Sequence, residues 1–197
     1  MRLSLSLSCM VILILLVELS LPVFMRSEIN SPGEATVTIR EFEECTLAVV
    51  DGDNNWAHLD NGILIIDLNG EVIGRREVRT FGSESDPIFE ISNNRVEDME
   101  CQLILLLNGV PRRTIIRIYV KTSYSNVKSF WITSFTKEGG IGSFTLRGMD
   151  TARFWIGIYT IWASSGEVEA RLRVDGSLED ASLEADILNF NIKFKIG

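Results

Sequence analysis

The sequence predicts an all-β protein folded as an antiparallel β-sandwich or barrel. Three observations support this: apolar residues recur mainly at the two-residue period of strands, the apolar runs are short, and turn residues separate them about every ten residues. The chain has 197 residues, of which 46% are apolar and 23% charged, so it is long enough for one sizeable core and is not disordered by composition. We therefore expect a single folded domain.

The N-terminal residues predict export. Arg2 gives a positive start, and residues 9–17 (CMVILILLV) form an uninterrupted apolar run of signal-peptide length. We expect residues 1–26 to be a signal peptide or a signal-anchor helix, residues 27–34 a lead segment, and residues 35–197 one β-sandwich domain. An anchor is the alternative to cleavage, although Glu18 and Pro22 disfavour a membrane-spanning helix. Either reading places the protein outside the cell or on its surface, with a membrane contact only through this segment.

Predicted strands follow one another from residue 35. The first, residues 35–42 (ATVTIREF), alternates, with Val37 and Ile39 on one face. Further strands are expected at residues 46–50, 62–68, 71–78, 87–92, 101–107, 113–120, 130–135, 142–146, 153–163, 167–174 and 189–196. Residues 175–188 (DGSLEDASLEADIL) contain helix formers behind N-cap residues, so a short helix and a charged connection are both open there.

Two of these strands carry distinctive patterns. In residues 153–163 both faces are apolar, and Trp155 and Tyr159 share one of them. Such a strand is either central and covered on both sides, or part of an aromatic surface that docks another subunit or a sugar. In residues 189–196 the outward positions are Asn and Lys, and outward lysines suit the edge of a sheet.

The stretch VVDGDNNWAHLDNG, residues 49–62, has oxygen-bearing side chains at alternate positions. Asp51, Asp53 and Asn55 match the first ligands of a calcium-binding loop, but that loop needs glycine at its sixth position and glutamate at its twelfth. Trp56 and Gly62 stand there instead. The flanking runs are strand-like, so the stretch predicts a connection between strands. Calcium is a weak alternative, and no cofactor is expected.

Two cysteines, Cys45 and Cys101, remain beyond the predicted signal segment. In an exported protein they could form one disulfide, and the alternative is a pair of buried thiols. Neither lies in a CxxC motif or beside a histidine, so zinc binding and redox chemistry are not expected.

Charge and composition argue against several functions. The formal charge of −8 repels phosphate backbones, so nucleic acid is not an expected partner. His58 is the only histidine, and the sequence has no GxSxG motif, so we expect no enzyme. A monomeric surface module that binds sugar or calcium is the main alternative to a structural role. Its sugar-stacking candidates are Trp56, Trp131, Trp155 and Trp162.

Residues of about 36 to 110 also show a familiar order of motifs. A "V-x-D" first hairpin precedes an "F-x-I-x-N-N-x-x-x-D" strand and turn. This order resembles a family of archaeal exported β-proteins, which is similar to the TasA and camelysin group of secreted jelly-roll sandwiches. The matching positions are Val50, Asp51, Asn61, Gly62, Phe89, Ile91, Asn93, Asn94 and Asp98.

The resemblance implies a jelly-roll-like β-sandwich that builds extracellular filaments or pili. In TasA-like proteins the N-terminal segment of one subunit pairs with a strand groove of the next. The corresponding donor segment here would be residues 29–39, with Ile29, Val37 and Ile39 as candidate donor-strand residues. Trp155 and Tyr159, on the aromatic strand at residues 153–163, are the candidate subunit contacts. The implied partner is another copy of the chain, and the resemblance implies no catalytic residues.

Overall fold

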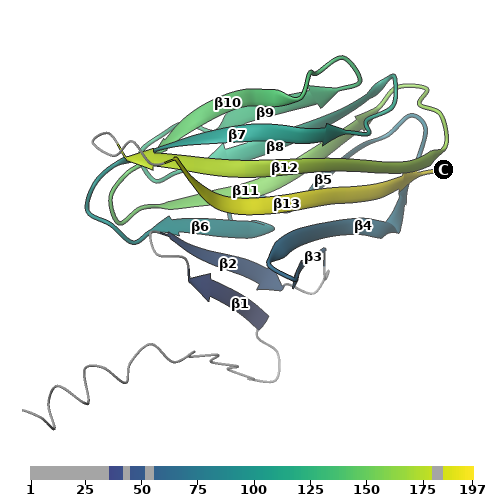
Figure 1. The fold of residues 1–197 in the computed structure, drawn as a ribbon. Coiled ribbons are helices and arrows are strands. Elements are labelled where there is room, and N and C mark those ends of the chain that lie inside the picture. Colours follow the sequence, from purple (N-terminus) through teal and green to yellow (C-terminus); the bar gives the residue numbers. More distant parts are fainter. Residues whose placement is uncertain (1–35, 42–44, 52–55, 179–183) are drawn as a thin grey trace, which may run out of the picture.

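A computed structural model of the chain describes residues 36–41, 45–51, 56–178 and 184–197. These residues form thirteen strands in two sheets that pack face to face (Figure 1). The seven-stranded sheet has the order β1-β2-β6-β11-β8-β9, with β5 also beside β11. The six-stranded sheet has the order β10-β7-β12-β13-β4-β3. The predicted β-sandwich is therefore confirmed, while its jelly-roll connectivity stays a prediction.

The strands are β1 (Thr36–Glu41), β2 (Cys45–Asp51), β3 (Ala57–Asp60), β4 (Ile63–Ile73), β5 (Val78–Phe81), β6 (Phe89–Asn93), β7 (Met99–Asn108), β8 (Thr114–Lys121), β9 (Lys128–Thr133), β10 (Gly139–Leu146), β11 (Thr151–Thr160), β12 (Gly166–Leu178) and β13 (Glu184–Ile196).

Four details differ from the sequence-based expectation. The strand predicted at residues 71–78 is not formed as such, because β4 continues to Ile73 and β5 begins only at Val78. The strand β3 was not predicted; it pairs with β4 through the turn at Asn61 and Gly62, whose φ angles of 49° and 84° suit a two-residue hairpin. A short helix was one of the two alternatives for residues 175–188. This prediction is wrong for the described residues, because β12 runs to Leu178 and β13 begins at Glu184. Finally, β13 lies between β12 and β4 and runs parallel to β4, so it is neither an edge strand nor purely antiparallel in its pairing.

The core lies between the sheets and is rich in phenylalanine. Phe89 of β6 stacks on Phe154 of β11 with ring centroids 4.4 Å apart. It also meets Phe190 of β13 in the other sheet at 5.6 Å, and Phe144 of β10 meets Phe154 edge-on at 5.7 Å. Because these rings come from both sheets, they join the two layers. Burial of each such ring stabilises the fold by roughly 2–3 kcal/mol.

Asn93, the last residue of β6, is buried and hydrogen-bonds the backbone of two turns, one after β6 and one after β10. Its side-chain nitrogen donates to the backbone carbonyls of Glu97 at 2.8 Å, Arg147 at 3.2 Å and Leu146 at 3.3 Å. Its side-chain oxygen accepts from the backbone N–H of Arg95 at 2.9 Å. Only 2% of Asn93 is exposed, so these groups have little access to water as a substitute partner.

We predict that Asn93→Ala destabilises the fold by about 2–3 kcal/mol, because buried backbone groups lose their partners. The neighbouring Asn94→Ala is the matched control, since Asn94 is exposed and bonds only the Thr46 hydroxyl among the contacts of the described residues. We expect the control to change stability by less than about 0.5 kcal/mol. Denaturant unfolding of both variants tests this, and equal effects would contradict the role of Asn93.

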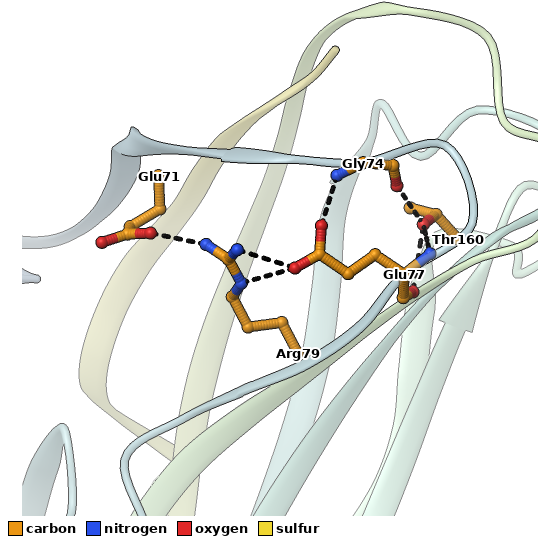
Figure 2. A network of polar contacts seen from close by, with 5 residues as sticks. All are labelled: Glu71, Gly74, Glu77, Arg79 and Thr160. Carbon is orange, nitrogen blue, oxygen red and sulfur yellow. Dashed lines mark hydrogen bonds and ion pairs between the residues drawn. The ribbon is translucent and has the colours of Figure 1, made fainter.

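A polar network joins the two sheets where β4 turns into β5 (Figure 2). Arg79 of β5 pairs with Glu71 of β4 in the other sheet and, at 2.7 Å, with Glu77 in the turn. The Glu77 carboxylate also accepts the backbone N–H of Gly74 at 2.6 Å. The Thr160 hydroxyl, at the end of β11, accepts the backbone N–H of Glu77 at 2.9 Å and donates to the carbonyl of Gly74 at 2.6 Å.

The pKa of Glu77 is lowered, chiefly by the hydrogen bond from Gly74 and further by Arg79, against the opposing effect of burial. A lowered folded-state pKa means that Glu77 stabilises the fold above its unfolded pKa, and that this contribution is lost as the pH falls through the folded pKa. We therefore predict that Glu77→Gln lowers the melting temperature at neutral pH, and that its difference from the unaltered protein shrinks as both are acidified below the ordinary glutamate range.

Melting curves across that pH range measure the effect. Exchange of exposed Glu138 for Gln, in the turn between β9 and β10, is the charge-matched control. A Glu77→Gln deficit that stays constant with pH would show that its carboxylate charge is not what matters.

Candidate functional site

The outer faces of the two sheets differ in chemistry. On the six-stranded sheet the outward positions of the central strands β12 and β13 are mostly polar or charged, as in Glu169, Arg171, Lys193 and Lys195, although Ile63 of β4 and Leu106 of β7 are also exposed. This is the ordinary pattern of a solvated antiparallel face. On the seven-stranded sheet, outward positions of β8, β9 and β11 carry large aromatic rings instead. They form the aromatic–arginine cluster, which consists of Arg117, Tyr119, Trp131, Trp155 and Tyr159.

Strand register brings these side chains together. Tyr119 of β8 lies opposite Trp155 of β11, and Arg117 lies between Trp131 of β9 and Gly157 of β11. All of these positions alternate with buried ones, so their side chains leave the same face of the sheet. The cluster is thus a product of cross-strand pairing among β8, β9 and β11.

The rings pack in two nearly parallel pairs. Tyr119 and Trp155 stack with centroids 5.3 Å apart and planes 5° from parallel, while Trp131 and Tyr159 lie 6.4 Å apart and 10° from parallel. The hydroxyls of Tyr119 and Tyr159 meet at 2.8 Å, which joins the pairs. Aromatic contacts of this kind contribute about 0.5–1.5 kcal/mol beyond area burial.

Gly157 of β11 lies next to the rings of Tyr119 and Tyr159. A Cβ built there would meet the Cε2 atom of Tyr159 at 3.1 Å and that of Tyr119 at 3.2 Å. A side chain at this position would therefore require both tyrosine rings to shift by a few tenths of an ångström. The absence of a side chain allows the two rings to approach the backbone of β11 closely.

Arg117 is the cation of the cluster. Its guanidinium lies 4.7 Å from the ring centroid of Tyr119 and 4.8 Å from that of Trp131, within the range of cation–π attraction. Its Nη2 donates to the Ser129 hydroxyl at 3.0 Å, and its buried Nε has no hydrogen-bond partner among the described residues. Trp131 donates its own indole N–H to the same Ser129 hydroxyl at 3.4 Å.

The two tyrosines differ in acidity. The pKa of Tyr159 is lowered, first by the hydrogen bond from Tyr119 and then by Arg117, against burial. The pKa of Tyr119 is raised, first by burial and then by its interaction with Tyr159. In the ionised pair, the Tyr119 hydroxyl therefore keeps its proton and donates a hydrogen bond to the Tyr159 oxygen.

Trp155 and Tyr159, the contacts expected from sequence, do lie on one outer face, but they are not its most accessible part. Trp155 is only 8% exposed. Glu84, between β5 and β6, pairs with Lys121 of β8 at 4.0 Å, and Lys121 lies opposite Arg153 of β11, two residues before Trp155. Trp131 is 50% exposed and is the ring that a partner would meet first. Sequence reasoning missed Arg117 and Tyr119, because only the register reveals that they flank these rings.

The calcium candidates are not assembled into a described site. Asp51 is the last residue of β2, while Asp53 and Asn55 lie outside the described residues. Over residues 36–41, 45–51, 56–178 and 184–197, no group of three or more His, Cys, Asp or Glu side chains could hold a metal ion. His58 is exposed on β3.

The two cysteines come from opposite sheets. Cys45 of β2 and Cys101 of β7 are both buried, and the Cys45 sulfur lies 3.9 Å from that of Met99, two residues before Cys101. Burial, and secondly the proximity of Cys45, raises the pKa of Cys101 well above the usual thiol range. The structure carries both residues as thiols, which is one of the two alternatives that the sequence left open.

The candidate donor strand is in part an ordinary strand of its own sheet. Val37 and Ile39 belong to β1 and lie opposite Val50 and Ala48 of β2. Ile29, like the predicted signal segment 1–26, lies outside the described residues. None of the described segments forms a helix of the length and apolar character that crossing a membrane requires.

Comparison with known proteins does not show which family the chain belongs to. No family model matches it, and no curated protein matches it. It is similar to the PapD-like domain 7 of human CEP192, with 13% identity, a TM-score of 0.40 and coverage of 89% of this chain and 95% of that one. It is also similar to the N-terminal domain of PorA (10% identity, TM-score 0.40, coverage 78% and 97%). The CooA pilin subunit of enterotoxigenic Escherichia coli is a third neighbour (8% identity, TM-score 0.31, coverage 61% and 81%).

These TM-scores are too low to carry an argument about function. The resemblance to TasA-like proteins therefore stays a prediction, and the function has to be argued from the edges and faces of this sandwich.

We predict that Tyr119→Phe raises the pKa of Tyr159, because Phe cannot donate the hydrogen bond that stabilises the Tyr159 phenolate. The chain has three tyrosines, so Tyr124→Phe in the background leaves only the pair in the starting protein. Ultraviolet absorbance of tyrosinate during alkaline titration measures the change. A Tyr159 transition that does not move would show that the two hydroxyls are not bonded in solution.

Proposed function

We propose that this protein is an extracellular, non-catalytic structural subunit that joins other copies of itself by exchange of the strand β1. The observation that carries the proposal is the place of β1 in the fold. It is the first described strand of the chain, it ends the seven-stranded sheet, and β2 is the strand with which it pairs (Figure 1).

Strand exchange requires little change in the sandwich. The β1 of a second copy has the same sequence and can take the same antiparallel register on β2, from Thr36 opposite Asp51 to Glu41 opposite Thr46. Main-chain hydrogen bonds would supply affinity, as in other β-augmentation contacts. Because each copy gives one strand and accepts another, the contact is head-to-tail and leads to an open filament.

The other sheet edges are less suited to this contact. At the opposite side of the sandwich, β9 and β10 lie against each other, and Lys128 of β9 donates to the carbonyl of Ser143 in β10 at 3.2 Å. The register of β10 is also broken by a bulge near Gly142. The remaining edge strands, β3 and β5, have only four residues each. Short strands, bulges and edge lysines all oppose pairing with another chain.

We predict that the secreted protein forms filaments, and that a covalent link between β1 and β2 abolishes them. Ile39 and Ala48 are directly opposite each other, which suits an engineered disulfide in the double variant Ile39→Cys with Ala48→Cys. Ala48 is half-buried and lies between the buried Leu47 and Val49, so its side chain leaves the outer face of the sheet, away from the buried Cys45. The oxidised variant should remain monomeric under negative-stain electron microscopy, and reduction should restore filaments.

Two controls accompany this experiment. Each single cysteine variant should still form filaments, which separates the link from the substitutions. A version that starts at Cys45 retains both core cysteines but lacks β1, and it should form none. Filaments from the oxidised double variant, or monodisperse particles from the unaltered secreted protein at high concentration, would overturn strand exchange.

A second candidate function, a surface module that binds a ligand, is favoured by a separate observation. The aromatic–arginine cluster places a half-exposed tryptophan, a cation and two tyrosine hydroxyls on one solvent-facing surface.

A further inference from the structure

The charges around the aromatic–arginine cluster are balanced except at its centre. Lys121 pairs with Glu84 at 4.0 Å, and Arg153 pairs with Glu90 at 2.9 Å, both on this face. Among the described residues, no carboxylate pairs with Arg117. A cation held among aromatic rings without a carboxylate, in a chain of net charge −8, is a specific site for an anionic group from outside.

The surroundings of Arg117 suit a ring that carries hydroxyl groups. The Trp131 indole is 50% exposed and presents a broad apolar surface beside the guanidinium. The electron-rich face of an aromatic ring attracts the weakly positive C–H groups on the flat face of a pyranose. The hydroxyls of Tyr119, Tyr159 and Ser129 lie around the same cation and can donate to or accept from sugar hydroxyls.

We propose that this cluster binds a uronic acid residue of an acidic polysaccharide. The sugar carboxylate pairs with Arg117, the pyranose face lies on Trp131, and the tyrosine hydroxyls bond the neighbouring ring hydroxyls. The proposal deepens the second candidate function and does not require strand exchange, because β1 and β9 lie at opposite ends of the sheet order.

Shape favours a saccharide over an acidic peptide. The cluster lies on the open face of a sheet, whereas an extended peptide docks by main-chain pairing at a sheet edge. Stacked rings, the bond between the tyrosine hydroxyls and the close approach over Gly157 also hold the cluster in one geometry before any ligand arrives. A preformed surface loses little conformational entropy on binding, which suits a weak ligand repeated along a polymer.

We predict that an oligosaccharide of galacturonic acid binds the full secreted protein and shifts the indole N–H signals of Trp131 and Trp155 in nitrogen–proton spectra, while that of Trp56 does not move. The chain has four tryptophans, so single Trp→Phe variants assign the signals. Arg117→Gln and Trp131→Ala should each weaken binding about tenfold or more, because each removes one of the principal contacts.

Arg147→Gln is the matched control. Arg147 also lies over an aromatic ring, that of Tyr124 at 4.6 Å, but the pair belongs to turns and not to the sheet face. Its exchange should leave the affinity unchanged. The spectra of the unaltered protein test the site even if a cluster variant fails to fold.

Two further probes separate the chemical classes. The same oligosaccharide with its carboxyls methyl-esterified should bind at least about tenfold more weakly, since it keeps the rings but loses the charge. Polyglutamate should not shift the Trp131 signal. Equal binding of the ester, equal binding of polyglutamate, an unchanged affinity in Arg117→Gln, or no shift at millimolar oligosaccharide would each overturn the proposal. Filament formation is measured separately, so neither result decides the other.

Discussion

Burial of the two inward sheet faces against each other is the constraint on which the rest of this structure depends. Phe89 shows it most directly, because its ring stacks on Phe154 of its own sheet and meets Phe190 of the opposite one. Removal of apolar area from water is the dominant favourable term in folding, and a dense interior requires that rings from both layers fit together. Every strand that contributes to this core has its register fixed, since a shift by one residue would turn its apolar side chains outward.

A fixed register also decides what the outer faces present. On the six-stranded sheet it produces a mostly polar surface over β12 and β13, and on the seven-stranded sheet it gathers the aromatic rings around Arg117. Core and candidate site are therefore two consequences of the same strand alternation. The outer rings are not needed to fill the interior, which is why their arrangement with a cation and hydroxyls points to recognition of a partner.

Several residues of the motif that resembles TasA-like proteins stabilise turns in this structure. Asn93 bonds the backbone of two turns, and Asp98 accepts the backbone N–H of Gly148 at 3.0 Å. Asn61 and Gly62 supply the positive φ angles of the hairpin between β3 and β4. These residues stabilise connections that many sandwiches need. Their presence therefore says more about how the chain folds than about what it assembles with, and the assembly has to be judged from the sheet edges.

The sequence by itself determined the fold class, most strand positions and the inward faces, because period-two alternation is a local property. The last strand shows this well, with Phe190, Ile192 and Phe194 buried as their spacing predicts. Tertiary structure alone decided that this strand is central and parallel to β4, that β1 lies at an edge, and that Arg117 and Tyr119 join Trp131 and Trp155. The physical reason is that alternation assigns a residue to a face but not to a neighbour. Neighbours depend on which strands pair and in what register, and those pairings are settled only when the whole core closes.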